Sequence, residues 1–234
     1  MSRASRLDAI VDCVPHSHTV ADIGTDHGYI AVDLIEKNLA RHVIASDISP
    51  NSLEKARLLV HERGLEGSIS TRVGYGLSVL EAGEVQTAII AGLGGVLISE
   101  ILENDREIAK TIDTFILQPM QLKTPLRKYL LENGYIIIDE VLVRESINRY
   151  YVIMVVKHGR EKIKDDMDYY LGRRLVEKRD PLLPEYILHN IKRRQEILNN
   201  LSKGRASQEI EARKIKLKGE IQKLKEVYVN VCTD

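Results

Sequence analysis

The chain has few cysteines, no long apolar run and no net charge. Its two cysteines, Cys13 and Cys232, lie near opposite ends of the 234 residues, which excludes a disulfide framework and a C-x-x-C metal or redox pair. No run of about 18 apolar residues is present that could cross a membrane, and the first residues lack the apolar stretch of a secretory signal. We therefore expect a cytoplasmic protein with reduced thiols and no membrane partner.

A bound metal is not expected either. The segment "CVPHSH" brings Cys13, His16 and His18 together, but no fourth ligand is evident. Histidines in a loop before a first strand are commonly exposed, so we interpret these two as surface residues.

The zero net charge hides an uneven distribution. Residues 1–159 carry 16 Lys and Arg against 21 Asp and Glu, a net charge of −5, whereas residues 160–234 carry 18 against 13, a net charge of +5. The C-terminal third could therefore attract a polyanion, although helices rich in Lys and Glu are also simply well solvated. The candidates for phosphate contacts are Lys192, Arg193, Arg194, Lys203 and Arg205. Almost no aromatic residues lie among them, which argues against stacking on single-stranded bases.

Seven short apolar runs rich in β-branched residues lie between residues 19 and 157. They are "TVADIG", "HVIAS", "SISTRV", "QTAIIAGL", "TFILQP", "YIIIDEVLV" and "YYVIMVV". Runs without alternation are typical of strands covered by helices on both faces, so we predict an α/β domain with a mostly parallel seven-stranded sheet. Only "RESINR" separates the last two runs, which predicts a hairpin and an antiparallel last strand. One helix is well delimited, with Ser49 as its cap, Pro50 in its first turn and Gly64 at its end.

The C-terminal part has the pattern of a helical hairpin. One apolar stripe is formed by Leu188, Ile191, Leu198 and Leu201, and a second by Ile210, Leu217, Ile221, Leu224 and Tyr228. The turn "SKGRAS" between them lets the two helices fold back as a coiled-coil-like pair, each burying its stripe against the other. We therefore predict two domains, residues 1–159 and residues 160–234, with "RDPLLPE" as the step into the hairpin.

The loop "DIGTDHGY" follows the first strand, where a nucleotide cofactor binds in such a sheet. A dinucleotide fingerprint G-x-G-x-x-G starting at Gly24 would need glycines where Asp26 and Tyr29 stand, and a carboxylate there would repel a pyrophosphate. The sulfonium and ammonium groups of S-adenosylmethionine reverse the argument, because an acid at Asp26, or at Asp22 in the strand, attracts them. Asp47 ends the second strand, 23 residues after Gly24, and suits the two ribose hydroxyls.

Glycines stand at two further strand ends. Gly74 and Gly76 follow the third strand, where a backbone must pass close to an adenine ring. Gly92, Gly94 and Gly95 follow the fourth strand and leave room for a second flat ligand. With the acid at the second strand end, this pattern favours S-adenosylmethionine over NAD.

In these residues the chain resembles the bacterial tRNA (adenine-N1)-methyltransferases of the TrmK type, which act on adenosine 22. The resemblance extends over essentially the whole chain, from the early "RL" through "DIGTDHGYIAVDLI", "ASDISPNSLEKA", "AGLGG", "LQPMQ" and "ENGYIIIDEVL" to the helical hairpin. It implies a Rossmann-like methyltransferase fold, S-adenosylmethionine as the methyl donor, tRNA as the substrate and a C-terminal domain that helps to hold the tRNA.

The resemblance also implies roles for individual residues. The predicted cofactor-binding residues are Gly24, Thr25, Asp26, His27, Gly28, Asp47, Ile48, Gly74, Tyr75, Gly76, Ala91 and Gly92. The predicted substrate-binding residues are Leu93, Gly94, Gln118 and Pro119, together with the five basic residues of the C-terminal part. Two positions depart from the family pattern. Leu93 replaces Met in G-M-G-G and conserves volume and polarity. Tyr75 replaces Asp in G-D-G-L, and either alters cofactor affinity or stacks on or bonds to the adenine ring instead.

The predicted reaction needs little chemistry from the protein. Adenine N1 has a lone pair and no proton, so its attack on a sulfonium methyl requires no general base, and catalysis can rest on orientation and on acceptors that favour the cationic product. Asp26 and Gln118 are the candidate catalytic residues, whereas His27 is expected to have a structural or cofactor-contact role. The target must be unpaired or flipped out, because N1 lies on the Watson–Crick edge, and the basic hairpin would supply contacts that offset this cost.

We expect a monomeric enzyme that methylates N1 of adenine 22 in tRNA. Two alternatives stay open. One is a methyltransferase of the same fold acting on another RNA or on a small molecule, and the other is a non-catalytic adapter with a degenerate cofactor pocket, for which Tyr75 is the best support.

Overall fold

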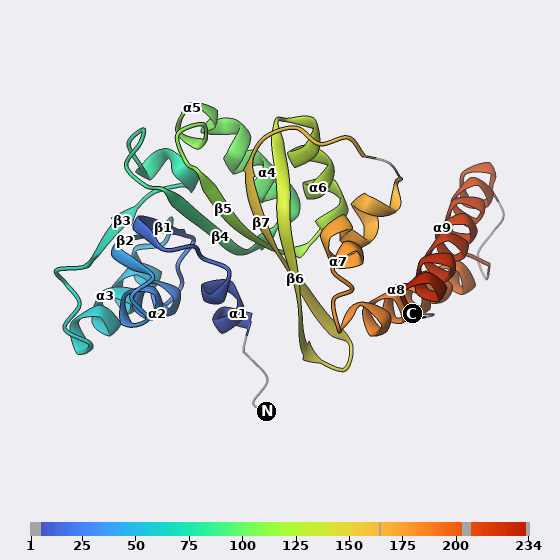
Figure 1. Ribbon diagram of the computed structural model, residues 1–234, viewed down its shortest axis with the longest axis horizontal. Coiled ribbons are helices and arrows are strands. Elements are labelled where there is room, and N and C mark those ends of the chain that lie inside the picture. Colours follow the sequence, from blue (N-terminus) through green and yellow to red (C-terminus); the bar gives the residue numbers. More distant parts are fainter. Residues whose placement is uncertain (1–5, 164, 203–206, 233–234) are drawn as a thin grey trace.

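The computed structural model describes residues 6–163, 165–202 and 207–232. Lys203 and Arg205, two of the predicted phosphate-binding residues, lie outside the described residues. A seven-stranded sheet forms the centre of the protein, with helices on both of its faces, and two long helices lie beyond one edge of the sheet (Figure 1).

The sheet has the strand order β3-β2-β1-β4-β5-β7-β6. Its strands are β1 (Ser17–Ile23), β2 (Ala40–Asp47), β3 (Ile69–Val73), β4 (Thr87–Gly94), β5 (Thr114–Gln121), β6 (Tyr135–Ser146) and β7 (Arg149–His158). Strands β1 to β5 run parallel, and β7 runs antiparallel to both of its neighbours, β5 and β6. The predicted mostly parallel sheet with an antiparallel seventh strand is therefore confirmed. The strand order reverses between β1 and β4, which is where open α/β sheets bind their ligands.

Helices cover the two faces of the sheet, as the unbroken apolar runs predicted. One face carries α1 (Arg6–Asp12), α2 (Tyr29–Glu36) and α3 (Pro50–Glu62), and the other carries α4 (Gly95–Asn104), α5 (Arg106–Ala109) and α6 (Lys123–Glu132). Successive residues of β4 alternate between two separate cores: Ile89 packs with α1 and α2, and Ile90 packs with α4 and α6. Both faces of the central strands are buried, which explains their continuous apolar sequence.

Helix α3 begins and ends where its sequence predicted. Ser49 caps it, because the backbone N–H of Ser52 donates to Ser49 Oγ at 3.3 Å, and Pro50 is its first residue. Gly64 follows its end with a φ angle of 65°, a conformation that favours glycine.

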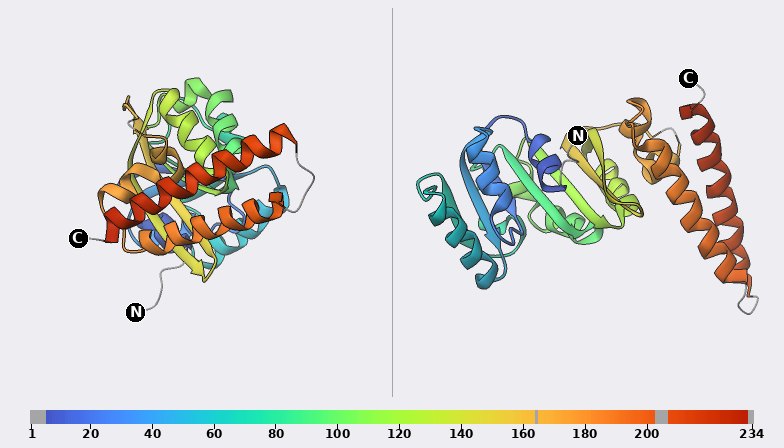
Figure 2. Two further views of the ribbon diagram at one scale, coloured as in Figure 1. Left: turned by 90° about the vertical axis from the view of Figure 1, so that its right-hand side faces the viewer. Right: turned by 90° about the horizontal axis from the view of Figure 1, so that it is seen from below.

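The C-terminal part ends in the predicted helical hairpin. Helices α8 (Leu183–Ser202) and α9 (Gln208–Cys232) lie side by side and antiparallel (Figure 2). The buried residues of α9 are Leu217, Ile221 and Leu224, which belong to its predicted stripe. The stripe predicted for α8 was partly wrong: Leu188 is 48% exposed, and the buried residues are Leu183, Tyr186, Ile187 and Ile191. The start of α8 packs into the core of the sheet as well as against α9, and this rotates its buried face away from Leu188.

A buried arginine ties the segment before the hairpin to the sheet. This segment contains a helical turn (Asp168–Gly172) and α7 (Arg173–Glu177). Arg127 of α6 is fully buried, and its Nε donates to Glu140 Oε1 of β6 at 2.8 Å. The same guanidinium donates to the backbone carbonyls of Tyr169, Tyr170 and Leu171 at 2.9, 3.3 and 3.2 Å. Residues 168–177 therefore pack against α6 and β6, although the sequence placed them in the C-terminal domain.

Candidate active site

A cavity of about 380 Å³ opens at the carboxyl ends of β1 and β4, where the strand order reverses. Its lining residues are Arg6, Leu7, Asp22, Gly24, Thr25, Asp26, His27, Gly28, Tyr29, Ile30, Ala91, Gly92 and Leu93. The structure thus brings together all five predicted residues of the loop after β1 and three predicted residues of β4.

The loop after β1 is held by its own backbone and by β2. Gly24 and Gly28 have φ angles of 80° and 75°, which residues with side chains rarely adopt. The Gly28 N–H donates to Thr25 Oγ1 at 3.2 Å, and the N–H groups of Gly24 and Thr25 both donate to the Ser46 carbonyl at 2.8 Å. A Cβ on Gly28 would lie 3.1 Å from the Cβ of Ala56, so this glycine also lets α3 approach the loop. These contacts give the cavity a preformed floor.

The first of two carboxylates in the cavity is buried. Asp22 is 3% exposed, and burial raises the pKa of its carboxyl group to about 6. A hydrogen bond from Thr25 acts in the opposite direction, while the charge of Asp47 adds to the increase. Since the raised pKa reflects a carboxylate without a full counter-charge, this position can accept a cationic group of a ligand.

The second carboxylate lies at the exposed rim. Asp26 has 68% of its side chain exposed, and its Oδ2 lies 2.8 Å from Nδ1 of His27. Ser52 Oγ donates to Asp26 Oδ1 at 3.4 Å, and Lys55 Nζ lies 3.8 Å from the same atom. The His27 ring stacks on that of Tyr29, with 5.4 Å between the ring centres. His27 therefore has two neighbours, Asp26 and Tyr29, that orient its ring.

The predicted nucleoside-binding residues meet at the neighbouring ends of β2 and β3. Asp47 pairs with Val73 in the register of the two strands, and Asp47 Oδ1 accepts from the Ser49 N–H at 2.7 Å. Just beyond these strand ends, Ile48 is 67% exposed and Tyr75 is 42% exposed. Two large exposed apolar side chains beside a carboxylate suit the ring and the ribose of an adenosine.

The predicted acceptor side lies at the ends of β4 and β5. Ala91 pairs with Gln118 and Leu93 with Pro119. The register of the two strands is irregular both before and after Leu93. Gly94 caps α4, and a Cβ on Gly95 would overlap with the Leu122 carbonyl, so the two backbones approach closely here. Gln118 is fully buried and does not line the cavity, which differs from the direct substrate contact that the sequence predicted.

Arg6 connects Gln118 to the cavity. Its Nη1 donates to Gln118 Oε1 at 2.5 Å, and its guanidinium lies 5.5 Å from the ring centre of Tyr151. A Cβ on Gly92 would lie 3.7 Å from the same nitrogen of Arg6. No role was predicted for Arg6, because it precedes the first strand and its "RL" dipeptide carries no chemical pattern.

The predicted phosphate-binding residues of α8 differ from one another. Lys192 and Arg193 are exposed, whereas Arg194 forms an ion pair with Glu220 of α9 at 2.8 Å, with both side chains largely buried. The Arg194 guanidinium also lies over the ring of Tyr170. Arg193 and Arg194 both line a groove of about 500 Å³ beside the end of β5 and the start of α6, but Arg193 has no ion pair with a described residue.

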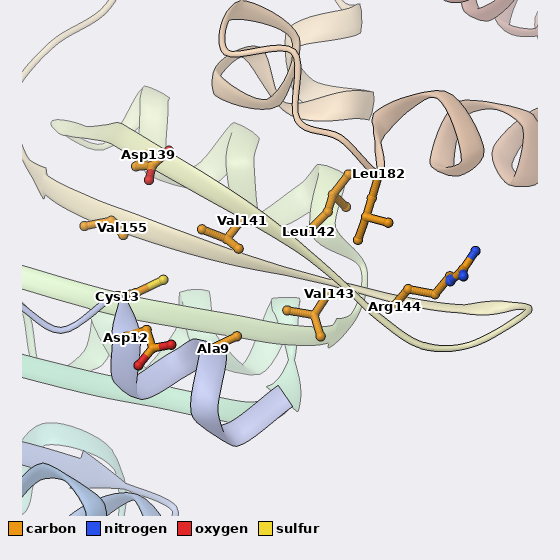
Figure 3. Close-up of a pocket in the computed structure, with 10 residues that line it drawn as sticks. All are labelled: Ala9, Asp12, Cys13, Asp139, Val141, Leu142, Val143, Arg144, Val155 and Leu182. Atoms are coloured by element: carbon orange, nitrogen blue, oxygen red, sulfur yellow. The ribbon is translucent and has the colours of Figure 1, made fainter. Parts of the chain in front are cut away.

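A separate cavity of about 630 Å³ lies between α1 and β6 (Figure 3). It shares no lining residue with the cavity at the strand ends. Cys13 lies in it, and burial raises the pKa of this thiol to about 11, so the thiol is not a nucleophile near neutral pH.

Two features are absent from the part of the chain that the structure describes. Within it, no group of three His, Cys, Asp or Glu side chains is arranged to hold a metal ion. None of its helices is both long and apolar enough to cross a membrane.

Comparison with known proteins identifies the family. Residues 20–226 match the family model of TrmK, tRNA (adenine(22)-N(1))-methyltransferase. The tRNA (adenine(22)-N(1))-methyltransferase of Bacillus subtilis is 32% identical over 169 residues, which cover 72% of this chain and 71% of that protein. The chain belongs to the TrmK family.

Solved structures agree with this membership over both parts of the chain. The crystal structure of the B. subtilis m1A22 tRNA methyltransferase TrmK superimposes with a TM-score of 0.86 at 27% identity, covering 96% of this chain and 98% of that one. TrmK of Mycoplasma capricolum, in complex with S-adenosyl-homocysteine, gives 0.81 at 25% identity and 99% coverage of both chains. A Streptococcus pneumoniae protein in complex with S-adenosyl-L-methionine also gives 0.81, at 27% identity, covering 97% of this chain and 99% of that one. The predicted family and Rossmann-like methyltransferase fold are confirmed.

Proposed function

We propose that this chain transfers the methyl group of S-adenosylmethionine to N1 of adenine 22 in tRNA. The observation that carries the proposal is the preformed glycine loop with Asp22 and Asp26, at the strand ends where such sheets bind ligands, in a member of the TrmK family. Two of its structural relatives were solved with S-adenosylmethionine or its product bound, which supports the same donor here.

The residues of the cavity fit the charges of this donor. Asp22 and Asp26 supply negative charge for its ammonium and sulfonium groups, and the guanidinium of Arg6 supplies positive charge for its carboxylate. Asp47 would accept hydrogen bonds from the ribose, with Ile48 and Tyr75 against the adenine of the donor. A pyrophosphate, in contrast, would meet the carboxylate of Asp26.

The proposed mechanism relies on orientation. When bound, S-adenosylmethionine supplies a methyl group on a positively charged sulfur, which adenine N1 can attack directly. No residue has to accept a proton, because N1 carries none. Leu93, with Pro119 and Gly94, forms the side against which the target base would lie. The carboxylate of Asp26 stabilises the positive charge that adenine acquires when N1 is methylated. Gln118 acts through Arg6 as a positioning residue.

We further propose a division of labour along the chain. Residues 1–159 would hold the donor and the target base, and residues 160–234, with a net charge of +5, would hold the tRNA. The proposed phosphate contacts are the exposed Lys192 and Arg193, together with the two basic residues outside the described part. Arg194 already forms an ion pair with Glu220. One chain supplies every proposed site residue, so we propose a monomer, which acts in the cytoplasm where tRNA is modified.

Two measurements test the function. Calorimetry should detect binding of S-adenosylmethionine, and no binding at millimolar donor would favour the adapter alternative. A radiolabelled methyl transfer to unmodified tRNA, followed by mapping of the modified base, should place the label on N1 of adenine 22. Label at a guanine or a cytosine would contradict the proposed acceptor.

A further inference from the structure

A second hollow, which we name the basic cleft, lies next to the cavity at the strand ends. It has a volume of about 260 Å³ and lies between the end of β5, the start of α6, the start of β7 and one face of α8. Its lining includes Met120 at the end of β5, Lys123 at the start of α6, Tyr151 of β7, and His189 and Arg193 of α8. No role in the reaction was predicted for Lys123 or His189.

The basic cleft and the proposed active site share a wall. Tyr151 lines the cleft, and its ring carries the guanidinium of Arg6, which lines the active-site cavity. Met120 also lines the cleft, and its sulfur lies 3.9 Å from Nε2 of Gln118, the residue that holds Arg6. A polymer with one nucleotide in the active site would therefore have its adjacent backbone within reach of the cleft.

Two cations in the cleft have no carboxylate partner among the described residues. Lys123 Nζ donates to the Tyr150 carbonyl at 3.2 Å and lies over the Tyr186 ring, and Arg193 is exposed without an ion pair to any described residue. Arg149, which also lines the cleft, differs, because Glu145 lies 3.1 Å from its guanidinium. Lys123 and Arg193 thus carry positive charges that form no ion pair with an acid of the described residues.

The charges of these cations act on His189, which lines the same cleft. Burial lowers the pKa of His189 most, and the charges of Arg193, Lys123 and Lys192 lower it further, while Glu196 opposes them. A neutral imidazole at this place can donate or accept a hydrogen bond without adding charge.

The shape of the cleft favours an anionic group over a base. Tyr150, Tyr151 and Tyr186 are all at least nine-tenths buried, so their rings offer little free surface for stacking. The hydroxyls of Tyr150 and Tyr151 are already bonded to Glu185 and Glu145, each at 3.2 Å. A volume of about 260 Å³ is also small for a ligand pocket, but it is ample for a phosphate.

We propose that the basic cleft binds a phosphodiester group of the tRNA backbone directly adjacent to the target adenosine, with Lys123 and Arg193 as its two cationic ligands. This inference rests on the proposed function and adds to it a defined contact between the catalytic domain and the hairpin. Fixing the backbone beside the target offsets the cost of flipping the base out and limits the positions from which N1 can approach the donor.

The first experiment measures the salt dependence of tRNA binding by the full-length protein. Arg193→Ala and Lys123→Ala should each weaken binding about tenfold at low salt and reduce the slope of log K against log salt by about one, since each removes one phosphate contact. Arg193→Lys and Lys123→Arg should keep the slope. Arg41→Ala, at the opposite end of the strands, and Lys110→Ala in the connection after α5 are matched controls that should leave affinity and slope unchanged. Slopes of the two alanine variants equal to those of the controls would overturn the proposal.

The second experiment locates the phosphate. A tRNA ligated from two pieces carries a neutral methylphosphonate on the 5′ or the 3′ side of nucleotide 22, and its affinity is measured with wild type and with both alanine variants. One of the two methylphosphonates should weaken binding to the wild type more than tenfold, and its further loss in Arg193→Ala and in Lys123→Ala should be smaller, because one of the two contacts is already absent there. Additive losses at both positions would mean that the cleft binds neither phosphate.

The outcomes separate this inference from the proposed function. If the wild type binds tRNA but places no methyl group on adenine 22, the function fails. If the wild type methylates adenine 22 and the two residues show no coupling to either phosphate, only the basic cleft fails.

Discussion

Arg6 donates a hydrogen bond of 2.5 Å from Nη1 to the side-chain oxygen of Gln118, which lies 112 positions further along the chain. Gln118 is fully buried, so this bond satisfies an amide oxygen that water does not reach. It also fixes the direction of a guanidinium that lines the same cavity as Asp22 and Asp26. The cavity therefore holds positive and negative groups at separate places, as a zwitterionic amino-acid moiety requires.

Replacement of Arg6 should weaken donor binding. We expect Arg6→Ala to raise the Kd for S-adenosylmethionine about tenfold, because the donor carboxylate loses a charge-assisted hydrogen bond, and Arg6→Lys to restore part of the affinity. Gln118→Leu should act in the same direction by releasing the guanidinium. Calorimetry measures both effects, with Arg63→Ala as the control, since Arg63 is paired with Glu36 on an exposed surface. A Kd of Gln118→Leu equal to that of the wild type would remove its positioning role.

Replacement of Asp26 should affect activity and leave the fold intact. The side chain is 68% exposed, so Asp26→Ala should change the free energy of unfolding by less than about 0.5 kcal/mol. We expect kcat/KM for S-adenosylmethionine to fall about tenfold, because the cation of the donor or of the product loses a neighbouring carboxylate. Asp12→Ala is the matched control, since Asp12 is equally exposed and paired with Lys37 away from the site. Wild-type kinetics in Asp26→Ala would exclude this carboxylate from the site.

The affinity for the donor should depend on pH through Asp22. Burial raises the pKa of this carboxyl group from 3.8 to about 6 in the folded protein, so the unfolded chain ionises first. The stability that Asp22 contributes is therefore present at low pH and is lost as the pH rises toward about 6. A cationic donor binds better to the ionised form of Asp22. In contrast to the stability, the affinity for S-adenosylmethionine should therefore decrease at low pH, by three- to fourfold between pH 7.5 and pH 5.5. Titration calorimetry of wild type and Asp22→Asn checks this, because the variant should bind more weakly and show a flat profile.

Much of the fold could be predicted because its signals are local. The seven apolar runs marked the strands, and Ser49, Pro50 and Gly64 marked both ends of α3. The loop from Gly24 to Gly28 could be recognised in the same way, since its backbone conformation requires glycine at both of its ends. At such positions a residue type follows from its own φ angle or from its nearest neighbours in sequence.

The contacts that depend on tertiary packing could not be predicted. The sequence around Arg6 does not indicate that Gln118 is its partner. The sequence around Arg127 likewise does not indicate that this arginine of an amphipathic helix is fully buried. The burial predicted for Leu188 was wrong for a related reason. Helix α8 packs against both the core of the sheet and α9, and its apolar stripe alone does not indicate which face of the helix contacts each of them. Arg193 and Arg194 look equivalent in sequence. Only the fold shows that Arg194 forms an ion pair with Glu220.

Tyr75, which replaces the Asp of the family pattern G-D-G-L, should stack on the adenine of the donor. Tyr75 and Ile48 are both exposed at neighbouring strand ends, so the adenine of the donor can lie between their side chains. We expect Tyr75→Ala to raise the Kd for S-adenosylmethionine five- to tenfold and Tyr75→Phe to keep it within twofold, because stacking requires the ring and not the hydroxyl. Leu58→Ala, an exposed apolar residue on α3, is the control. An equal loss in Tyr75→Phe would indicate a hydrogen bond to the adenine instead.

The buried pair of Arg127 and Glu140 should dominate the stability of the junction before the hairpin. Both side chains are 1% exposed, and Arg127 also satisfies three backbone carbonyls of residues 169–171. Arg127→Met would leave Glu140 buried without its counter-charge, so we expect the free energy of unfolding to fall by about 3–5 kcal/mol in chemical denaturation. The neighbouring Lys128→Met should cost almost nothing, since its pair with Glu132 is exposed and loose at 3.8 Å. The double variant Arg127→Met, Glu140→Leu should recover part of the loss, and a cost below about 1 kcal/mol in Arg127→Met alone would mean that the pair is not what holds this segment on the sheet.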